Sequence, residues 1–125
     1  GTNVRVKLSK GRYFLSKERR LELVHFCLQF KEWEDEYKSL DGLSHAPAFD
    51  PTGEIAVRME LLSRKMKCVR EASRASDEYL APWIFRSVTT GVTFTTFEAE
   101  GVPFGRDMFY DRLRKFFYIL DKLRE

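Results

Sequence analysis

Large apolar side chains recur at alternating intervals of four and three positions in three separate stretches of this chain. This spacing places the side chains on one face of an α-helix, so each stretch predicts an amphipathic helix with a buried side. The three stripes are Phe26, Phe30, Trp33, Tyr37 and Leu40, then Ile55, Met59, Leu62, Met66 and Val69, and finally Phe109, Leu113, Phe116, Leu120 and Leu123. Three such stripes predict an all-α fold.

The first stripe predicts one helix of about six turns over residues 17–40. Ser16 precedes it and is a favourable N-cap, because a serine hydroxyl accepts from the free backbone N–H groups of the first turn. Gly42 follows it, where a left-handed C-cap is expected.

The second stripe predicts a helix over residues 51–74, after a loop over residues 41–54. Asp50 is its expected N-cap and Pro51 its first helical residue, a position where proline loses nothing by lacking an N–H. Two helices of similar length joined by a loop predict an antiparallel hairpin with a shared apolar seam.

A third segment begins at Ser76, with a shorter apolar stripe that consists of Leu80, Trp83, Ile84 and Val88. Pro82 starts this helix late or kinks it, and Gly91 ends it. Thr93 then caps a short helix that Gly101 closes, and a long helix follows over residues 106–124. A short helix, a tight turn and a second helix are the connectivity of a helix-turn-helix, which presents the start of its second helix to a DNA major groove.

Residues 3–15 alternate apolar and basic side chains and then turn near Gly11. This pattern fits a short β-hairpin, and it equally fits a flexible basic arm. We therefore expect one helical domain over residues 1–125. It comprises the arm or hairpin (1–15), the helical hairpin (16–75) and the helix-turn-helix-like unit (76–125).

Composition limits the class of protein. Hydrophobic residues make up 43% of the chain and aromatic residues 14%, which excludes a disordered chain. No apolar run approaches the roughly 18 residues of a membrane span and no signal peptide opens the chain, so we expect a cytoplasmic protein without a membrane partner. Cys27 and Cys68 lie within apolar helical patterns and are expected to be buried thiols, or a disulfide if their helices meet. Neither cysteine has a CxxC partner, so no metal and no other cofactor is expected.

The net charge of +3 conceals a segregated pattern. Residues 1–20 have a local balance of +6, and residues 31–60 one of −5. A basic surface of this kind permits an anionic partner at one side of the molecule.

The side of the last helix opposite its apolar stripe is rich in basic residues and tyrosines, which suit phosphate contact and groove readout. The candidate DNA-contacting residues there are Arg106, Tyr110, Arg112, Arg114, Lys115 and Tyr118. The N-terminal segment adds candidate phosphate contacts at Arg5, Lys7, Lys10 and Arg12. Asp107 and Asp111 lie on the same helix, and they leave open a solvated face whose charges balance one another.

Two further stretches carry a family resemblance: DPTGEIA (residues 50–56) and FYDRLRKFFYIL (residues 109–120). They are the most specific parts of a resemblance that covers nearly the whole chain. The chain resembles a group of small proteins from Firmicutes prophages and mobile elements. Their layout is similar to phage late-transcription regulators of the ArpU and RinA type, in which a helical hairpin precedes a sigma-like helix-turn-helix. The resemblance implies DNA contact by Arg106, Tyr110, Arg112 and Arg114. The long helix here begins Gly105-Arg106-Asp107, whereas sigma-type recognition helices begin with a Ser/Thr-Arg-Ser/Thr-like run.

Two functions follow as hypotheses. The first is a phage- or prophage-encoded transcriptional regulator in the cytoplasm of a bacterial host. It would bind double-stranded DNA, and its hairpin would serve to form a homodimer or to contact RNA polymerase. The alternative is a small phage protein that binds a host factor or a defence nuclease, or assists DNA packaging, without DNA contact. The acidic stretch Glu32, Glu34, Asp35 and Glu36 could then mimic phosphates. The chain has no Gly-rich phosphate loop, nucleophile elbow or HExxH, so we do not expect an enzyme.

Overall fold

The computed structural model describes residues 11–44, 50 and 52–125. Within these residues every regular element is a helix, so the all-α prediction is confirmed. The helices are α2 (Lys17–Leu28), α3 (Phe30–Ser44), α4 (Glu54–Ser76), α5 (Ala81–Thr90), α6 (Phe94–Ala99) and α7 (Arg106–Leu123). Most of the predicted N-terminal arm or hairpin lies outside the described residues. Its described end, from Gly11, forms a turn and leads directly into α2.

The first predicted helix is present but bent. Ser16 caps α2 as predicted, because its hydroxyl accepts from the Arg19 N–H at 3.2 Å. The Gln29 N–H donates to the Phe26 carbonyl three residues earlier, at 3.2 Å. This tighter turn interrupts the helix before α3 begins. The bend lets α2 pack on α5 and α7 while α3 packs on α4. Gly42 lies inside α3, so its prediction as a left-handed cap was wrong.

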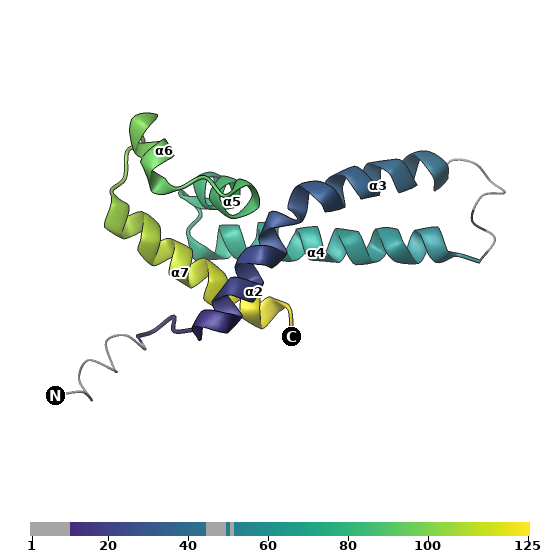
Figure 1. The fold of residues 1–125 in the computed structure, drawn as a ribbon, viewed down its shortest axis with the longest axis horizontal. Helices are drawn as coiled ribbons and strands as arrows, with labels where there is room; N and C mark the ends of the chain where they lie inside the picture. Colours follow the sequence, from purple (N-terminus) through teal and green to yellow (C-terminus); the bar gives the residue numbers. More distant parts are fainter. Residues whose placement is uncertain (1–10, 45–49, 51) are drawn as a thin grey trace.

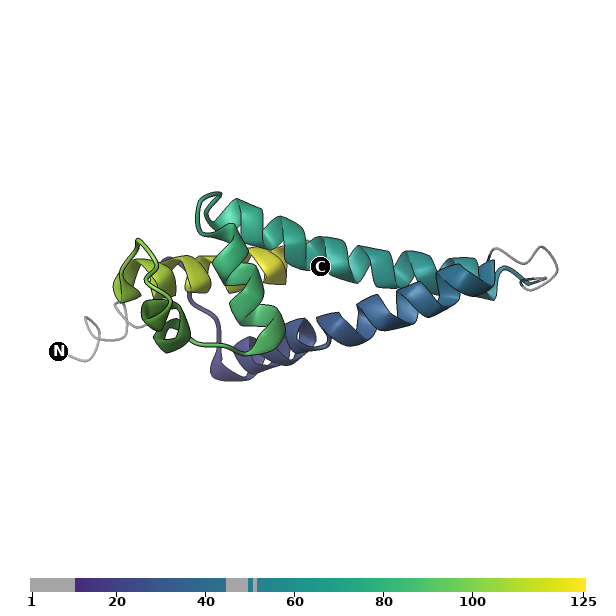
Figure 2. The ribbon, with the colours of Figure 1, turned by 90° about the horizontal axis from the view of Figure 1, so that it is seen from above.

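Helices α3 and α4 form the predicted antiparallel hairpin, which projects from the rest of the molecule (Figures 1 and 2). The apolar seam is buried at Trp33, Leu62 and Met66, but Tyr37 and Leu40 toward the tip are only partly buried. Among the described residues the tip consists of α3 and α4 alone, so its seam side chains remain partly exposed.

The start of α4 differs from the prediction in its position. The helix begins at Glu54, not at residue 51, and Gly53 precedes it with a φ of 77°. Asp50 still caps it, because its two carboxylate oxygens accept from the N–H groups of Ile55 and Ala56, each at 3.1 Å. Pro51 lies outside the described residues.

Helix α4 continues to Ser76, which is buried and donates to the Ser73 carbonyl at 2.7 Å. The prediction that Ser76 begins the third segment was therefore wrong. The acceptor that organises the start of α5 is Asp77, whose carboxylate accepts from the Leu80 N–H at 2.9 Å. Gly91 ends α5 as predicted, with a φ of 84° that a side chain would strain.

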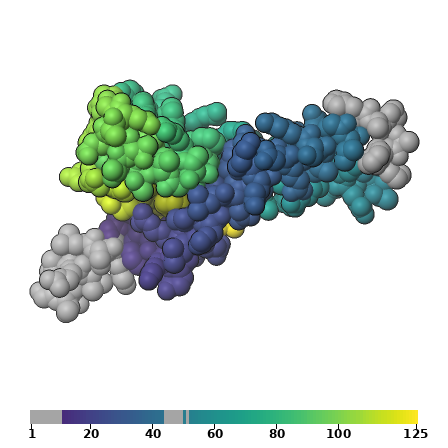
Figure 3. Space-filling model, turned by 45° about the horizontal axis from the view of Figure 1, so that its top comes forward, coloured from purple at the N-terminus to yellow at the C-terminus, as the bar shows by residue number. Residues whose placement is uncertain are grey.

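The last two helices have the predicted order of a short helix, a turn and a long helix. They pack through a small cluster of Phe94, Phe97 and Phe109. Helix α7 contributes Phe116 and Leu120 to the main core, which gathers side chains from α2, α3, α4 and α5. Figure 3 shows α7 (yellow) lying between the α5–α6 end (green) and α2 (purple).

The burial of two side chains differs from the sequence-based prediction. Leu123 was predicted to be buried, yet 41% of it is exposed, because α7 ends there beside α4. Cys27 is fully buried and Cys68 is only partly buried, and both thiols are free. Among the described residues, no helix combines the length and apolar character that a membrane crossing requires.

Candidate nucleic-acid interface

The predicted DNA-contacting residues do not form one continuous face. Arg5, Lys7 and Lys10 lie outside the described residues. The other seven fall into three groups along α7 and the segment before α2. They are Arg106 with Tyr110, Arg112 with Arg114 and Arg12, and Lys115 with Tyr118.

Arg106 stands at the first turn of α7. Its guanidinium lies 5.3 Å from the centre of the Phe94 ring and 6.0 Å from that of Tyr110. It makes no ion pair with the described residues. Two aromatic rings therefore flank an exposed cation at the start of α7.

Arg112 has a different environment, because its guanidinium is already occupied. Its Nε donates to the Asp77 carboxylate at 2.9 Å, and its Nη1 donates to Asp111. Hydrogen bonding to Asp77 raises the pKa of Arg112 above its ordinary value. Burial acts to raise the pKa of Asp77, but hydrogen bonds from the Leu80 N–H and from Arg112 outweigh it and lower that pKa. Arg112 therefore ties α7 to the junction of α4 and α5.

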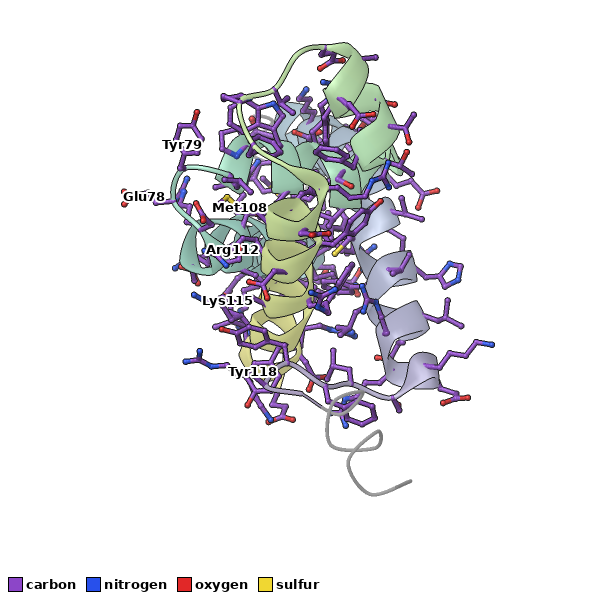
Figure 4. The ribbon with its side chains drawn as sticks, turned by 90° about the vertical axis from the view of Figure 1, so that its left-hand side faces the viewer. Glu78, Tyr79, Met108, Arg112, Lys115 and Tyr118 are labelled. Carbon is purple, nitrogen blue, oxygen red and sulfur yellow. The ribbon has the colours of Figure 1, made fainter. Side chains whose placement is uncertain are left out.

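Figure 4 shows this side of α7, with Met108, Arg112, Lys115 and Tyr118 along the helix and with Glu78 and Tyr79 beyond them. Lys115 makes no ion pair with any described residue. The Tyr118 ring contacts Tyr13, with ring centres 5.7 Å apart, and Lys122 lies 5.4 Å from its centre. The segment before α2 thus packs against the second half of α7, where Lys115 remains partly exposed.

A cleft of about 430 Å³ opens where the segment before α2 meets α2 and α7. Its charged lining consists of four arginines and one carboxylate: Arg12, Arg20, Arg112, Arg114 and Asp111. The single carboxylate is shared, because Asp111 binds Arg112 and also lies 3.8 Å from Arg114. The cleft therefore has an excess of positive charge.

Arg20 is the member of this group that sequence reasoning did not single out. It lies over the Phe117 ring at 5.4 Å and makes no ion pair with the described residues. Burial, and then the nearby charge of Arg114, lower the pKa of Arg20. Its only sequence signal was membership of the basic N-terminal run, because its position beside α7 depends on how α2 crosses that helix.

The preceding residue, Arg19, shows the opposite arrangement. Its Nε lies 2.7 Å from the buried Asp121 carboxylate, and its Nη2 lies 3.4 Å from Glu125. Arg19 therefore joins the two ends of the described chain and is not free to hold an external anion.

In residues 11–44, 50 and 52–125, no group of three His, Cys, Asp or Glu side chains is arranged to hold a metal ion.

Comparisons with protein-family models, with curated proteins and with solved structures found no match to this chain.

Proposed function

We propose that this protein is a DNA-binding transcriptional regulator of the phage or prophage type, which contacts duplex DNA through α7 and the segment before α2. The observation that supports this most is a group of free cations on α7 and beside it. Arg106, Lys115, Arg12 and Arg20 make no ion pair with the described residues, and all of them lie on α7 or its flank. Basic side chains elsewhere are of both kinds: Arg58, Arg64 and Arg86 are paired with carboxylates. Lys65, Arg70 and Arg74 on α4 make no ion pair with the described residues.

The roles of the residues differ in this proposal. Arg106 and Tyr110, at the start of α7, are placed to approach base edges in the major groove. Lys115 and the arginines of the cleft contact the phosphate backbone, which fixes the position of the protein without reading sequence. Arg112 is a positioning residue, because its ion pairs hold α7 in place.

The test is a duplex-binding titration over a range of salt concentrations, measured by fluorescence anisotropy. Affinity should fall linearly with salt on a double-logarithmic plot, and removing one phosphate contact by Lys115→Ala should reduce the slope by about 1. Arg64→Ala is the matched control, because Arg64 is an exposed α4 residue paired with Glu60 at 3.0 Å. No affinity at low salt, or an equal loss in the control, would refute the proposal.

A protein-binding module is the second candidate, and the exposed surface of α4 favours it. Val57 is 69% exposed and Leu61 is 42% exposed, and they lie one turn apart on the hairpin. Phosphate mimicry by α3 has less support, because Asp35 pairs with Lys31 at 2.9 Å and Glu36 pairs with Arg58 at 2.6 Å.

This candidate is tested by pull-down from a bacterial lysate with and without nuclease. A partner that survives nuclease and is lost in the Val57→Glu, Leu61→Glu double variant would support a protein partner such as RNA polymerase or another host factor. A partner that disappears with nuclease would instead support DNA binding.

A further inference from the structure

We propose that the cleft between the segment before α2, α2 and α7 is a binding site for one phosphate group, held by Arg20 and Arg114. The proposal deepens the function proposed above, and it rests on that function for the source of the phosphate, the backbone of a nucleic acid. The cleft holds about 430 Å³ and is lined by residues of three separate segments.

The charge of the cleft favours an anion as its ligand. Arg20 is partly buried, has no carboxylate partner in the described part of the chain, and lies close enough to Arg114 for the two charges to repel. Desolvating a guanidinium without a counterion costs free energy, and a like charge nearby adds to that cost. An anion between the two arginines would remove both costs.

The protein's own carboxylates do not supply this anion. Asp111 is engaged by Arg112 and reaches Arg114 only at 3.8 Å. Asp121, one turn beyond Phe117, is bound by Arg19 at 2.7 Å. Two neighbouring arginines of α2 therefore have different environments: Arg19 is paired with the buried Asp121, whereas Arg20 lines the open cleft.

The hydrogen-bonding geometry of the two arginines points to a phosphate group. A guanidinium presents a rigid fork of N–H donors that matches the oxygens of a phosphate, and two guanidiniums on different helices can grip it from two sides. The cleft contains no lysine among its lining residues, and its volume is at the lower end of small-ligand sites. A phosphate group with its attached sugar is the ligand class that fits these features.

Inorganic phosphate is the probe for the first experiment. Thermal unfolding is measured in phosphate and in sodium chloride at equal ionic strength, for the wild type and for Arg114→Gln and Arg64→Gln. If the dissociation constant is about 5 mM, about 50 mM phosphate should raise the midpoint of the wild type by roughly 5 °C over chloride. Arg114→Gln should lose most of this difference, while the control Arg64→Gln should keep it. Arg114 is half exposed, so its replacement leaves the fold intact.

An equal rise in all three proteins would overturn the proposal, because phosphate ions stabilise many proteins without binding at a site. A second measurement locates the site: phosphate should shift the amide resonances of residues 11–15 and of Arg20, and Arg20→Lys should weaken binding because an ammonium lacks the two-pronged contact. Shifts confined to other residues would contradict the assignment.

Duplex DNA is the probe for the second experiment, which separates this proposal from the function on which it rests. If phosphate binds at the cleft but the protein has no affinity for duplex DNA, the site stands and the regulator function fails. If DNA binds equally well to wild type and to Arg114→Gln, and phosphate has no specific effect, the regulator function stands and the cleft proposal fails.

Discussion

The ion pair between Asp77 and Arg112 allows a quantitative test of how α7 is attached to the rest of the fold. Asp77 has two tasks: one carboxylate oxygen accepts from the Leu80 N–H at 2.9 Å, and the other accepts from Arg112 at 2.9 Å. Asp77→Asn keeps an acceptor for the backbone and removes the charge, whereas Asp77→Ala removes both interactions. Comparison of the two variants separates the cap from the ion pair.

The magnitudes follow from the burial of the pair. The side chains of Asp77 and Arg112 are 19% and 33% exposed. This pair is therefore less solvated than a typical surface ion pair, and we expect its attraction to contribute about 1 kcal/mol, at the upper end of the range for surface pairs. Loss of a helix-capping acceptor costs about 1 kcal/mol in addition. We therefore expect Asp77→Asn to lower the free energy of unfolding by about 1 kcal/mol and Asp77→Ala by about 2 kcal/mol. In a chain of 125 residues, each kcal/mol lowers the melting midpoint by roughly 4 °C.

The assay is urea unfolding followed by circular dichroism at pH 7 and at pH 3. The pKa of Asp77 is depressed in the folded state, so its charge stabilises the fold above the unfolded pKa and that contribution is lost as the pH falls through the folded pKa. The effect of Asp77→Asn should therefore be full above about pH 5 and should shrink at pH 3. A double-mutant cycle with Arg112→Gln should give a coupling of about 1 kcal/mol at pH 7.

Three results would refute this reasoning. Equal destabilisation by Asp77→Asn and Asp77→Ala would show that the cap contributes nothing. An absent coupling energy would show that the ion pair is solvated and that Arg112 is free to meet a ligand. A pH-independent effect of Asp77→Asn would show that the charge has no part in stability.

Three further predictions concern the helices and the thiols. Gly42→Ala should stabilise the protein by about 0.5–1 kcal/mol in thermal melts, because Gly42 lies inside α3 with open space around it. Gly91→Ala should destabilise it by about 1 kcal/mol or more, because Gly91 has a φ of 84°. A change of the same sign in both variants would contradict these backbone conformations. Burial raises the pKa of the Cys27 thiol to about 12, so Cys27 should resist iodoacetamide at pH 8 in the native protein. The partly buried Cys68 should react under the same conditions, and peptide mass spectrometry would identify the modified residue. Modification of Cys27 before Cys68 would contradict this prediction. Phe97→Ala should cost about 3–5 kcal/mol in urea unfolding, because Phe97 is fully buried between α6 and α7; a loss below about 1 kcal/mol would mean that this cluster does not hold the two helices together.

The positions of the helices were predictable wherever a local signal set them. The three 4-3-4-3 stripes predicted the stretches that form α2 with α3, α4 and α7. Gly91 and Gly101 were correctly predicted to end their helices, and both have a positive φ. The boundaries that failed are those where a longer-range contact decides the outcome. The bend at Gln29 follows from the different partners of α2 and α3, and Asp50 caps α4 across intervening residues rather than from the adjacent position.

The sequence by itself determined the all-α class, the hairpin and the order of the last two helices, because helical periodicity and capping act over a few neighbouring residues. It also identified the cations of the last helix, but it could not tell which of them are free. Only the tertiary structure decided that Arg112 binds Asp77, 35 positions away, and that Arg20 on α2 comes to lie beside Arg114. Which charged side chains of a surface remain unpaired depends on which helices cross and at what point along their length. No local sequence pattern encodes that crossing.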